Sequence, residues 1–462
     1  MTSLNPNKHL KEQFVSNLSG SSVLEIFVLS ALFPMVILLR HTFGICKIGI
    51  RINTIVTSSP CPLPTAMMLV ESDDHLLTLL VVIPYTKLIG KVYELSKIGL
   101  HHHVPNETAL KKKDTSKVSL RNQRGYIITM MVDFLSIVLP MTLLCTVLSE
   151  WTYVSGALFI LVLLFSVASK RHGSSRDQEE GLYSLRDYVS AYRVSMMLIT
   201  CICILAVDFN IFPRRYAKTE TYGTSLMDVG VGAFVFANSF VSRQARGIST
   251  MGLRSALSST SPLLFLGFAR LVSTTGVDYQ VHVGEYGVHW NFFFTLAGVA
   301  VLTSVINVSP KYCGLVGSLV LLGYQVCLMS GLNSYLLSAE RGSDIISQNK
   351  EGIYSIFGEE ILLQCNLTYV TLILAINLEI LAILMLSDYI PGGKVSLLEQ
   401  AINRNLLAFF IVANLLTGLV NLSMDTLFVS PLPALLILII YCFIICAAAA
   451  YAEYNGFKLK FW

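Results

Sequence analysis

Charged residues are scarce in this sequence. They make up 13% of its 462 residues, whereas a soluble domain carries roughly 25%. A domain surrounded by water cannot cover its surface with so few charged side chains, and a disordered chain combines more charge with less apolar sequence. The shortage of charge therefore excludes both an ordinary soluble enzyme and a disordered protein.

Familiar motifs are also missing. The net charge is only +4, and no basic tract indicates nucleic acid. The sequence contains no nucleotide-binding loop, zinc-protease motif or hydrolase serine motif in a suitable context. We therefore expect no nucleic-acid partner and no nucleotide-driven chemistry.

Cysteine and histidine do not form a recognisable metal site either. Most of the ten cysteines lie in apolar runs, where a free cysteine behaves as a small hydrophobe. Cys201 and Cys203 have the wrong spacing for a metal site and no partner pair. The triplet His101–His103 could bind a metal, but histidines in a polar loop are more often solvated. We expect no metal and no bound cofactor.

Long apolar runs dominate the sequence. A spanning helix needs about 20 mostly apolar residues, and runs that are continuously apolar favour helices over the strands of a barrel. The clear runs are 23–39, 126–148, 151–169, 193–212, 289–308, 312–332, 366–386, 404–424 and 431–452. Shorter runs lie at 229–242 and 258–275, and the stretches 76–93 and 353–364 are ambiguous. We predict an all-α polytopic membrane protein with about 11–13 transmembrane helices.

No soluble domain fits between these runs. The longest polar stretch, 94–125, contains Lys111–Lys113 and is predicted to be a loop. We therefore expect one multispanning membrane domain over residues 1–462, with spans from residue 22 onward.

Lysine and arginine predict the orientation of the chain. If 76–93 does not cross the membrane, the loops richest in these residues share one side: 40–51, 170–190 and 243–257. That side is predicted to be the cytosol. The loop 213–228 falls on the opposite side although it carries three basic residues, which suggests that they have a use other than setting topology.

Charge is concentrated in one short segment that begins at Asp208. This aspartate lies in an apolar run near the predicted end of a span, where a carboxylate costs several kcal/mol unless it is paired or solvated. The segment fits either a structural ion pair at a helix end or an intramembrane base beside a cationic cluster that receives an anionic group. The density of charge adds weight to the second interpretation. Its charged residues are Asp208, Arg214, Arg215, Lys218, Glu220 and Asp228.

A second polar group opens the predicted span at 289–308. His289 and Asn291 lie at an apolar boundary, beside Trp290. They fit either a structural role, with Trp290 as an interfacial anchor, or a site in which His289 moves protons or orients a carbonyl near neutral pH. Arg270 is a weaker candidate, since an arginine inside an apolar run must be paired or reach the surface.

Several long blocks carry a resemblance to a known family: KEQFVSNLSGSSVLEI near the start, AVDFNIFPRRYAKTETYGTSLMDVGVGAFVF at 206–236, EYGVHWNFFFT at 285–295, KEGIYSIFG at 350–358, NRNLLAFFIVANLLTGLVNLSMDTL at 403–427, and the terminal Phe461-Trp462. They resemble the inositol acyltransferases of GPI-anchor biosynthesis, the PIG-W family and its fungal counterparts. Residues 52–125 and the segment after Gly358 depart from that pattern.

The resemblance implies a multispanning enzyme of the endoplasmic reticulum. Such enzymes move a fatty acyl chain, typically palmitoyl, from acyl-CoA to the inositol 2-hydroxyl of glucosaminyl-phosphatidylinositol. The expected partners are therefore acyl-CoA as co-substrate, this lipid and the bilayer.

The resemblance also implies that Asp208 and Lys218 are the essential residues. We assign Asp208 as the general base, and Lys218 as the group that holds the thioester oxygen or tunes Asp208. His289 is the reserve candidate for the base. The predicted substrate contacts are Arg214 and Arg215, which suit phosphate, together with Glu220, Asp228, Asn291 and Arg270.

The alternative function is a polytopic transporter that uses the Asp208, Arg214 and Lys218 cluster for ion or anion coupling. The residues alone leave the two functions nearly equal. A transporter is expected to show repeat symmetry and charges scattered over several spans, whereas this sequence shows no internal repeat and one dense cluster.

Overall fold

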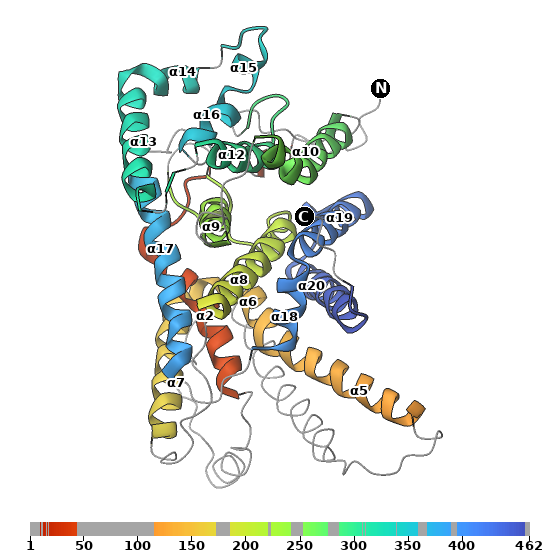
Figure 1. Ribbon diagram of the computed structural model, residues 1–462. Coiled ribbons are helices and arrows are strands. Elements are labelled where there is room, and N and C mark those ends of the chain that lie inside the picture. The colour runs from red at the N-terminus through yellow and green to blue at the C-terminus, as the bar shows by residue number, and fades with distance from the viewer. Residues whose placement is uncertain are drawn as a thin grey trace. The chain divides into compact units, whose positions relative to one another are not determined.

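Within its described residues, the computed structural model consists of helices joined by turns and loops, with one isolated β-bridge between Ser21 and Thr224 (Figure 1). It describes residues 10, 13, 14, 16, 18–43, 115–171, 185–219, 223–241, 253–275, 286–306, 308–309, 311–338, 340–358, 367–389 and 395–457. The predicted fold class is confirmed: the chain is an all-α polytopic membrane protein.

Eight helices in this part of the chain are long and apolar enough to cross a membrane: Val23–His41, Gln123–Leu144, Leu185–Ala206, Arg254–Val272, Cys313–Leu336, Leu367–Met385, Leu406–Ser423 and Pro431–Tyr454. Shorter apolar helices cover Ser149–Phe165, Leu226–Phe240 and Phe292–Ser304. Every clear or shorter run predicted above overlaps one of these helices. Of the ambiguous stretches, 353–364 overlaps a helix that ends at Gly358, and 76–93 lies outside the described residues.

Backbone contacts divide the chain into two compact units. The first comprises Met1–Ile26, Arg214–Glu379 and Phe461–Trp462, and the second comprises Phe27–Pro213 and Ile380–Lys460. The division falls inside helices α2 and α17, and between Pro213 and Arg214 it falls inside the charged segment that begins at Asp208.

The second unit contains most of α2 (Val23–Phe43) and these further elements: α5 (Thr115–Asp133), η2 (Phe134–Val138), α6 (Leu139–Leu144), η3 (Ser149–Trp151), α7 (Thr152–Arg171), α8 (Leu185–Ala206), η6 (Leu386–Tyr389), α18 (Leu397–Arg404), α19 (Leu406–Ser423), η7 (Thr426–Phe428) and α20 (Pro431–Tyr454). Helix α5 begins at Thr115, inside the stretch 94–125 that was predicted to be a loop. The first turns of α5 are polar, so hydropathy gave no sign of them.

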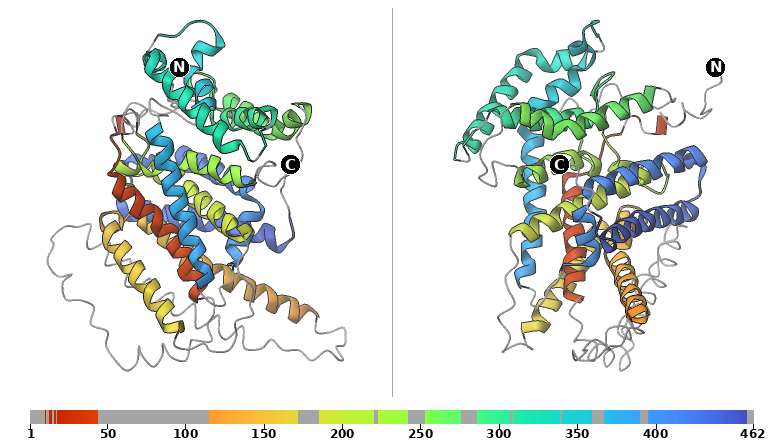
Figure 2. Two further views of the ribbon diagram at one scale, coloured as in Figure 1. Left: turned by 60° about the vertical axis from the view of Figure 1, so that its left-hand side comes forward. Right: turned by 45° about the vertical axis from the view of Figure 1, so that its right-hand side comes forward.

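Helix α8 lies at the centre of the second unit. It packs against α6, α18, α19 and α20 (Figure 2), and most of its residues are buried. The Tyr441 hydroxyl of α20 donates a hydrogen bond to the Cys201 carbonyl of α8 over 2.9 Å. The buried cysteines of this unit are free thiols, in keeping with their predicted role as small apolar residues: Cys145, Cys201, Cys203, Cys442 and Cys446.

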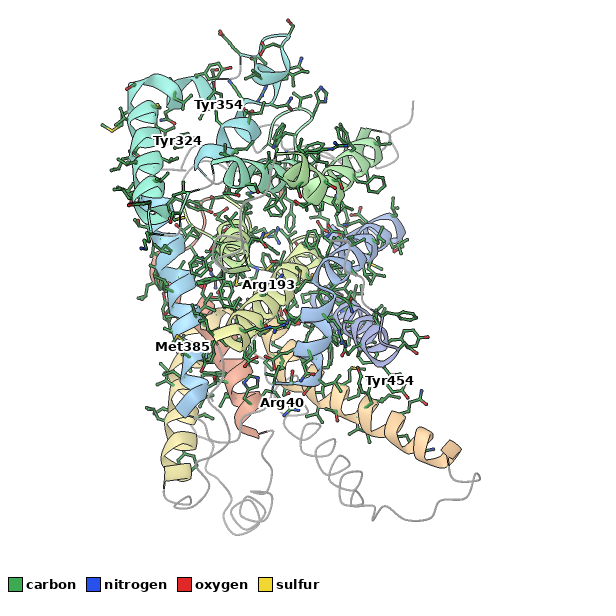
Figure 3. All side chains as sticks on the ribbon, in the orientation of Figure 1. Arg40, Arg193, Tyr324, Tyr354, Met385 and Tyr454 are labelled. Carbon is green, nitrogen blue, oxygen red and sulfur yellow. The ribbon has the colours of Figure 1, made fainter. Side chains whose placement is uncertain are left out.

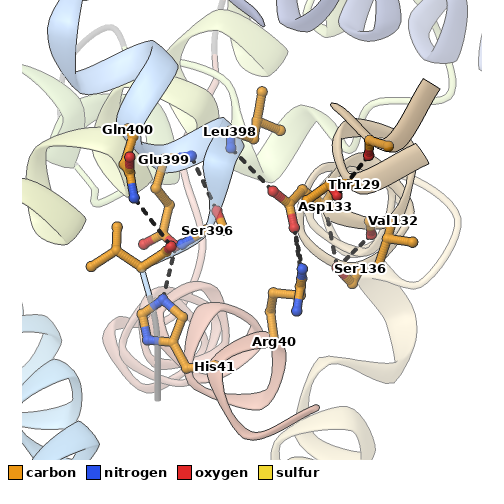
Figure 4. A network of polar contacts seen from close by, with 12 residues as sticks. Arg40, His41, Thr129, Val132, Asp133, Ser136, Ser396, Leu398, Glu399 and Gln400 are labelled. Atoms are coloured by element: carbon orange, nitrogen blue, oxygen red, sulfur yellow. Dashed lines mark hydrogen bonds and ion pairs between the residues drawn. The ribbon is translucent and has the colours of Figure 1, made fainter. Parts of the chain in front are cut away.

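A buried polar network ties three segments of the second unit together (Figure 4). The Arg40 guanidinium of α2 donates to Asp133 of α5 (Nε to Oδ1, 2.7 Å), and the Leu398 N–H of α18 donates to the other oxygen of Asp133 (3.1 Å). His41 follows Arg40 and lies 2.8 Å from Glu399 of α18. Since Asp133 is fully buried, its negative charge depends on these partners for compensation.

Glu399 also caps its own helix. Its carboxylate accepts the Ser396 N–H, while the Ser396 hydroxyl accepts the Glu399 N–H, so the two residues form a capping box. Burial raises the pKa of the Glu399 carboxyl, but the nearby His41 and the hydrogen bonds from His41 and Ser396 outweigh burial and hold that pKa below its usual range.

We expect Asp133→Asn to destabilise the second unit strongly. The substitution keeps the volume of the side chain but leaves the Arg40 charge without its carboxylate, and breaking a buried pair in this way typically costs about 3–5 kcal/mol. Thermal unfolding of the purified protein in detergent measures the effect. Gln400→Ala, at an exposed position on α18, is the matched control. Equal unfolding midpoints for the two variants would contradict this account of the network.

The first unit contains η4 (Arg214–Tyr216), α9 (Leu226–Val241), α10 (Leu253–Thr275), α12 (Phe292–Ile306), α13 (Cys313–Cys327), η5 (Leu328–Leu332), α14 (Asn333–Leu337), α15 (Ile345–Gln348), α16 (Lys350–Gly358) and most of α17 (Leu367–Met385). Helices α10 and α12 lie side by side, and α16 packs against α12 and α13. Tyr354 of α16 meets the ring of Tyr335 edge-on, with the ring centroids 6.3 Å apart (Figure 3).

Candidate functional site

Asp208 lies in the turn that follows α8. The sequence predicted a span to residue 212, but the helix ends at Ala206, and the Asp208 and Phe209 N–H groups bond three residues back in a tighter turn. Phe209 and Phe212 are fully buried in this turn. Their burial explains the error, because hydropathy cannot distinguish a buried apolar turn from a longer helix. The carboxylate is therefore carried by an anchored turn, outside the helix itself.

Asn421 of α19 holds this carboxylate. Its Nδ2 donates to Asp208 Oδ2 over 2.7 Å, and the Thr426 hydroxyl donates to Asn421 Oδ1 over 3.4 Å. In the same turn, Asn210 Nδ2 donates to the Leu427 carbonyl over 2.6 Å. The end of α19 and the segment after it thus fix the position and direction of Asp208.

Sequence reasoning missed Asn421 as a site residue. In the sequence, Asn421 is an isolated polar residue at the edge of a predicted span, and such a position is more typical of a structural role. Asn421 is distant from Asp208 in the chain, so no local pattern joins the two. The available signal was that both residues lie in blocks that carry the family resemblance.

Arg215 is engaged by Glu25 within the first unit. Its Nε lies 3.0 Å from Glu25 Oε1, and the same carboxylate accepts hydrogen bonds from the Tyr216 and Ser21 hydroxyls. The Ser21 N–H also donates to the Thr224 carbonyl over 2.8 Å. Together these bonds tie the basic segment that starts at Arg214 to the N-terminal segment.

Arg214 and Lys218 both lie over aromatic rings. The Arg214 guanidinium carbon is 4.0 Å from the ring centroid of Phe14, and Lys218 Nζ is 5.6 Å from that of Tyr286. Both distances are within the range of a cation–π contact. Arg214 and Lys218 are partly exposed, although the Nη1 atom of Arg214 is buried.

Asp228 lies in the first turn of α9. Its carboxylate accepts the Ser225 N–H, and the Ser225 hydroxyl accepts the Asp228 N–H. The carboxylate also accepts the N–H and the hydroxyl of Thr219, at 3.3 and 2.9 Å. These bonds give Asp228 a structural role next to Lys218, and its predicted contact with substrate stays a prediction. Glu220 lies outside the described residues.

The second polar group forms a loop ahead of α12. His289 is exposed, and its backbone N–H donates to Asn349 Oδ1 over 2.7 Å. Asn291 is buried: its Oδ1 accepts the Phe293 N–H, and its Nδ2 donates to the Gly267 carbonyl of α10. Asn291 therefore shapes the start of α12. His289 as a proton carrier and Asn291 as a substrate contact stay predictions.

Arg270 lies on an exposed face of α10. The sequence allowed a paired position or one that reaches the surface, and the structure shows that Arg270 reaches the surface; its predicted contact with substrate stays a prediction. No group of three or more His, Cys, Asp or Glu side chains that could hold a metal occurs within the described ranges. The triplet His101–His103 lies outside those ranges.

A family model described as GWT1 matches residues 106–359 and 363–452. The chain belongs to the GWT1 family. This is the inositol acyltransferase family, so the resemblance seen in the sequence blocks is confirmed. The match to the GWT1 model begins within 52–125 and is interrupted just after Gly358, which are the places where the sequence departs from the family pattern.

Three relatives support membership of the GWT1 family. The chain is 34% identical to GPI-anchored wall transfer protein 1 of Aspergillus oryzae, over 98% of this chain and 99% of the relative. It is 32% identical to the phosphatidylinositol-glycan biosynthesis class W protein of Dictyostelium discoideum, over 60% of this chain and 76% of the relative. It is 50% identical to an uncharacterised protein of Arabidopsis thaliana, over 79% and 96%. Membership supports a role in GPI-anchor biosynthesis and favours an acyltransferase over a transporter.

Two charged residues inside the helices of this GWT1-family chain were not predicted as site residues. Arg193 is half-buried in α8 (Figure 3) and makes no hydrogen bond or ion pair with any residue that the structure describes. Glu379 of α17 has a buried oxygen, Oε2, without a hydrogen-bond partner in the described part of the chain. The signal for both was a charge within an apolar run, which is costly in a membrane.

Proposed function

We propose that this protein transfers a fatty acyl chain, typically palmitoyl, from acyl-CoA to the inositol 2-hydroxyl of glucosaminyl-phosphatidylinositol. The observation that carries the proposal is the Asp208 carboxylate, anchored after α8 and held by Asn421, in a chain of the GWT1 family. A carboxylate held in this way has the chemistry of a general base toward an alcohol.

The proposed step needs no acyl-enzyme. Asp208 takes the proton of the inositol hydroxyl while the hydroxyl oxygen bonds to the carbonyl carbon of the thioester. The carbonyl oxygen then carries a negative charge, which the Lys218 ammonium stabilises. When the carbonyl re-forms, the carbon–sulfur bond breaks, and the coenzyme A thiolate takes the proton from Asp208.

The remaining polar residues have proposed roles of different kinds. Arg214 contacts phosphate of the lipid or of coenzyme A, since a guanidinium suits phosphate geometry. Arg215 is already bonded to Glu25, so its contribution to phosphate binding is secondary. Asp228 and Asn291 shape helix starts beside the substrate, and His289 stays in reserve as a base.

Microsomes from cells that lack their own inositol acyltransferase test the proposal. Restoring this chain is expected to produce acylated glucosaminyl-phosphatidylinositol when labelled palmitoyl-CoA is supplied. A product that forms only with another acyl donor would remove acyl-CoA from the proposal, and the absence of any acylated product would overturn the proposed function.

We further propose that the protein resides in the endoplasmic-reticulum membrane with the loop 213–228 in the lumen. The positive-inside rule, applied to the three basic loops, supports this orientation. A cysteine introduced at Thr221, in a background without other reactive cysteines, is expected to react with an impermeant reagent only after sealed microsomes are opened. A cysteine at Ser174, in a predicted cytosolic loop, is the matched control and is expected to react before opening. Reaction of the Thr221→Cys variant in sealed microsomes would reverse the orientation.

A further inference from the structure

In the first unit, the ammonium of Lys218 lies over the aromatic ring of Tyr286. The Lys218 ammonium lies 5.6 Å from the ring centroid of Tyr286, and the two residues come from chain segments about 70 positions apart, a separation that local pattern cannot relate. We propose that Tyr286 is a positioning residue that holds the Lys218 ammonium in place for acyl transfer. The catalytic part of this inference rests on the function proposed above.

A ring face suits this task for a chemical reason. An ammonium has three N–H donors, and a hydrogen-bonding holder takes up some of them. A ring attracts the positive charge through its quadrupole without accepting a conventional N–H hydrogen bond. The contact with Tyr286 in itself therefore uses none of the donors that a developing oxyanion requires.

The backbone directly after Tyr286 is fixed by the residues before α16. Val288 N–H donates to the Gln348 carbonyl over 3.0 Å, and His289 N–H donates to Asn349 Oδ1 over 2.7 Å. Gly287, between them, has φ +98°, and a Cβ there would lie 2.5 Å from Asn349 Cα. The turn thus needs glycine both for its backbone conformation and for the close approach of Asn349.

Hydrogen bonds from charged side chains hold the start of α16 in place. Lys350 is fully buried, and its Nζ donates to the Tyr335 and Ser338 carbonyls over 2.6 and 2.8 Å and to the Ser338 hydroxyl over 2.9 Å. Arg341 donates to both oxygens of Glu351, at 3.0 and 2.7 Å. These bonds fix the segment that carries Asn349, so Tyr286 rests against a rigid support.

A second close approach ties Tyr286 to the same helix. A Cβ on Gly352 would lie 2.6 Å from the Tyr286 carbonyl oxygen and 2.2 Å from Cδ1 of Trp290. The α16 backbone therefore lies directly against the turn on both sides of Gly287. A group that stabilises a transition state must be held to within about 0.5 Å by its supporting residues, and these contacts fix the backbone that carries the Tyr286 ring.

Steady-state kinetics of Tyr286 variants test the proposal. Tyr286→Leu removes the ring and is expected to lower kcat about tenfold, the loss that corresponds to a partly desolvated cation–π contact, with little change in the KM for palmitoyl-CoA. Tyr286→Phe keeps the ring face, so its kcat is expected to stay close to that of the wild type. Tyr312→Leu, at an exposed tyrosine of the same unit, is the matched control. Equal losses in Tyr286→Phe and Tyr286→Leu would assign the effect to the hydroxyl and overturn the proposal.

A chemical readout separates this inference from the proposed function. The rate at which a small amine-reactive reagent modifies Lys218 is measured by peptide mass spectrometry in each folded variant, and thermal unfolding confirms the fold. Loss of the ring in Tyr286→Leu is expected to speed modification, while Tyr286→Phe and Tyr312→Leu match the wild type. If the wild-type protein showed no acyl transfer, the proposed function would be refuted. The labelling rates would still show whether the Tyr286 ring holds the Lys218 ammonium. An unchanged labelling rate in Tyr286→Leu would overturn the positioning role.

Discussion

Asp208→Asn is expected to lower kcat by about 100- to 10,000-fold, the range that a positioned general base contributes. An amide has nearly the shape of a carboxylate, and its oxygen can still accept the hydrogen bond that Asn421 now donates to Asp208 over 2.7 Å. The variant should therefore fold and reach the membrane. It cannot take the proton of the inositol hydroxyl, so the loss should fall on turnover.

The matched control for this variant is Asn210→Ala. Asn210 lies in the same turn and donates to the Leu427 carbonyl, so the control tests whether disturbing the turn alone is enough to stop turnover. Steady-state rates of the purified proteins are the measurement. Near-normal turnover in Asp208→Asn would remove Asp208 as the base.

Lys218→Ala is expected to lower kcat by about 100- to 1000-fold, the usual loss when one preorganised oxyanion donor is removed. An interaction that is stronger in the transition state than in the ground state acts on the rate. The KM for palmitoyl-CoA should therefore change little. If Lys218 instead bound a phosphate of coenzyme A, KM would rise and kcat would stay nearly intact.

Lys218→Arg separates these two roles further. A phosphate contact tolerates a guanidinium, whereas a tight oxyanion site built around a compact ammonium does not. Lys311→Ala, at an exposed lysine of the same unit, controls for the loss of a surface charge. Steady-state kinetics with palmitoyl-CoA and a soluble glucosaminyl-phosphatidylinositol analogue give both constants. An unchanged kcat in Lys218→Ala would reassign this residue to binding.

Hydropathy predicted the helices because each apolar run of suitable length has one dominant physical explanation in a membrane. It was less informative at helix ends. The span predicted to end at residue 212 stops at Ala206, because Phe209 and Phe212 are buried in a turn that hydropathy reads as helix. Helix α5 begins earlier than expected for the opposite reason, since its first turns are polar.

The candidate site was only partly predictable for a related reason. The dense charge after Asp208 drew attention to this segment as a candidate site, yet the partners of its residues within each unit come from distant parts of the chain. Arg215 pairs with Glu25 and Asp208 with Asn421. Neither pairing has a local spacing that sequence reasoning could use, because both depend on how separate helices pack. Lys350 shows the same limit most clearly, since only the fold reveals that its buried ammonium donates hydrogen bonds to the Tyr335 and Ser338 carbonyls.

The most direct measurement reconstitutes the purified protein in vesicles that contain glucosaminyl-phosphatidylinositol and supplies palmitoyl-CoA as the only acyl donor. Mass spectrometry of the lipid then locates the added chain. We expect a palmitoyl ester on the inositol 2-hydroxyl, formed by the wild type and by Asn210→Ala but not by Asp208→Asn. A palmitoyl group at another position, no transfer by the wild type, or equal product from Asp208→Asn would contradict this expectation.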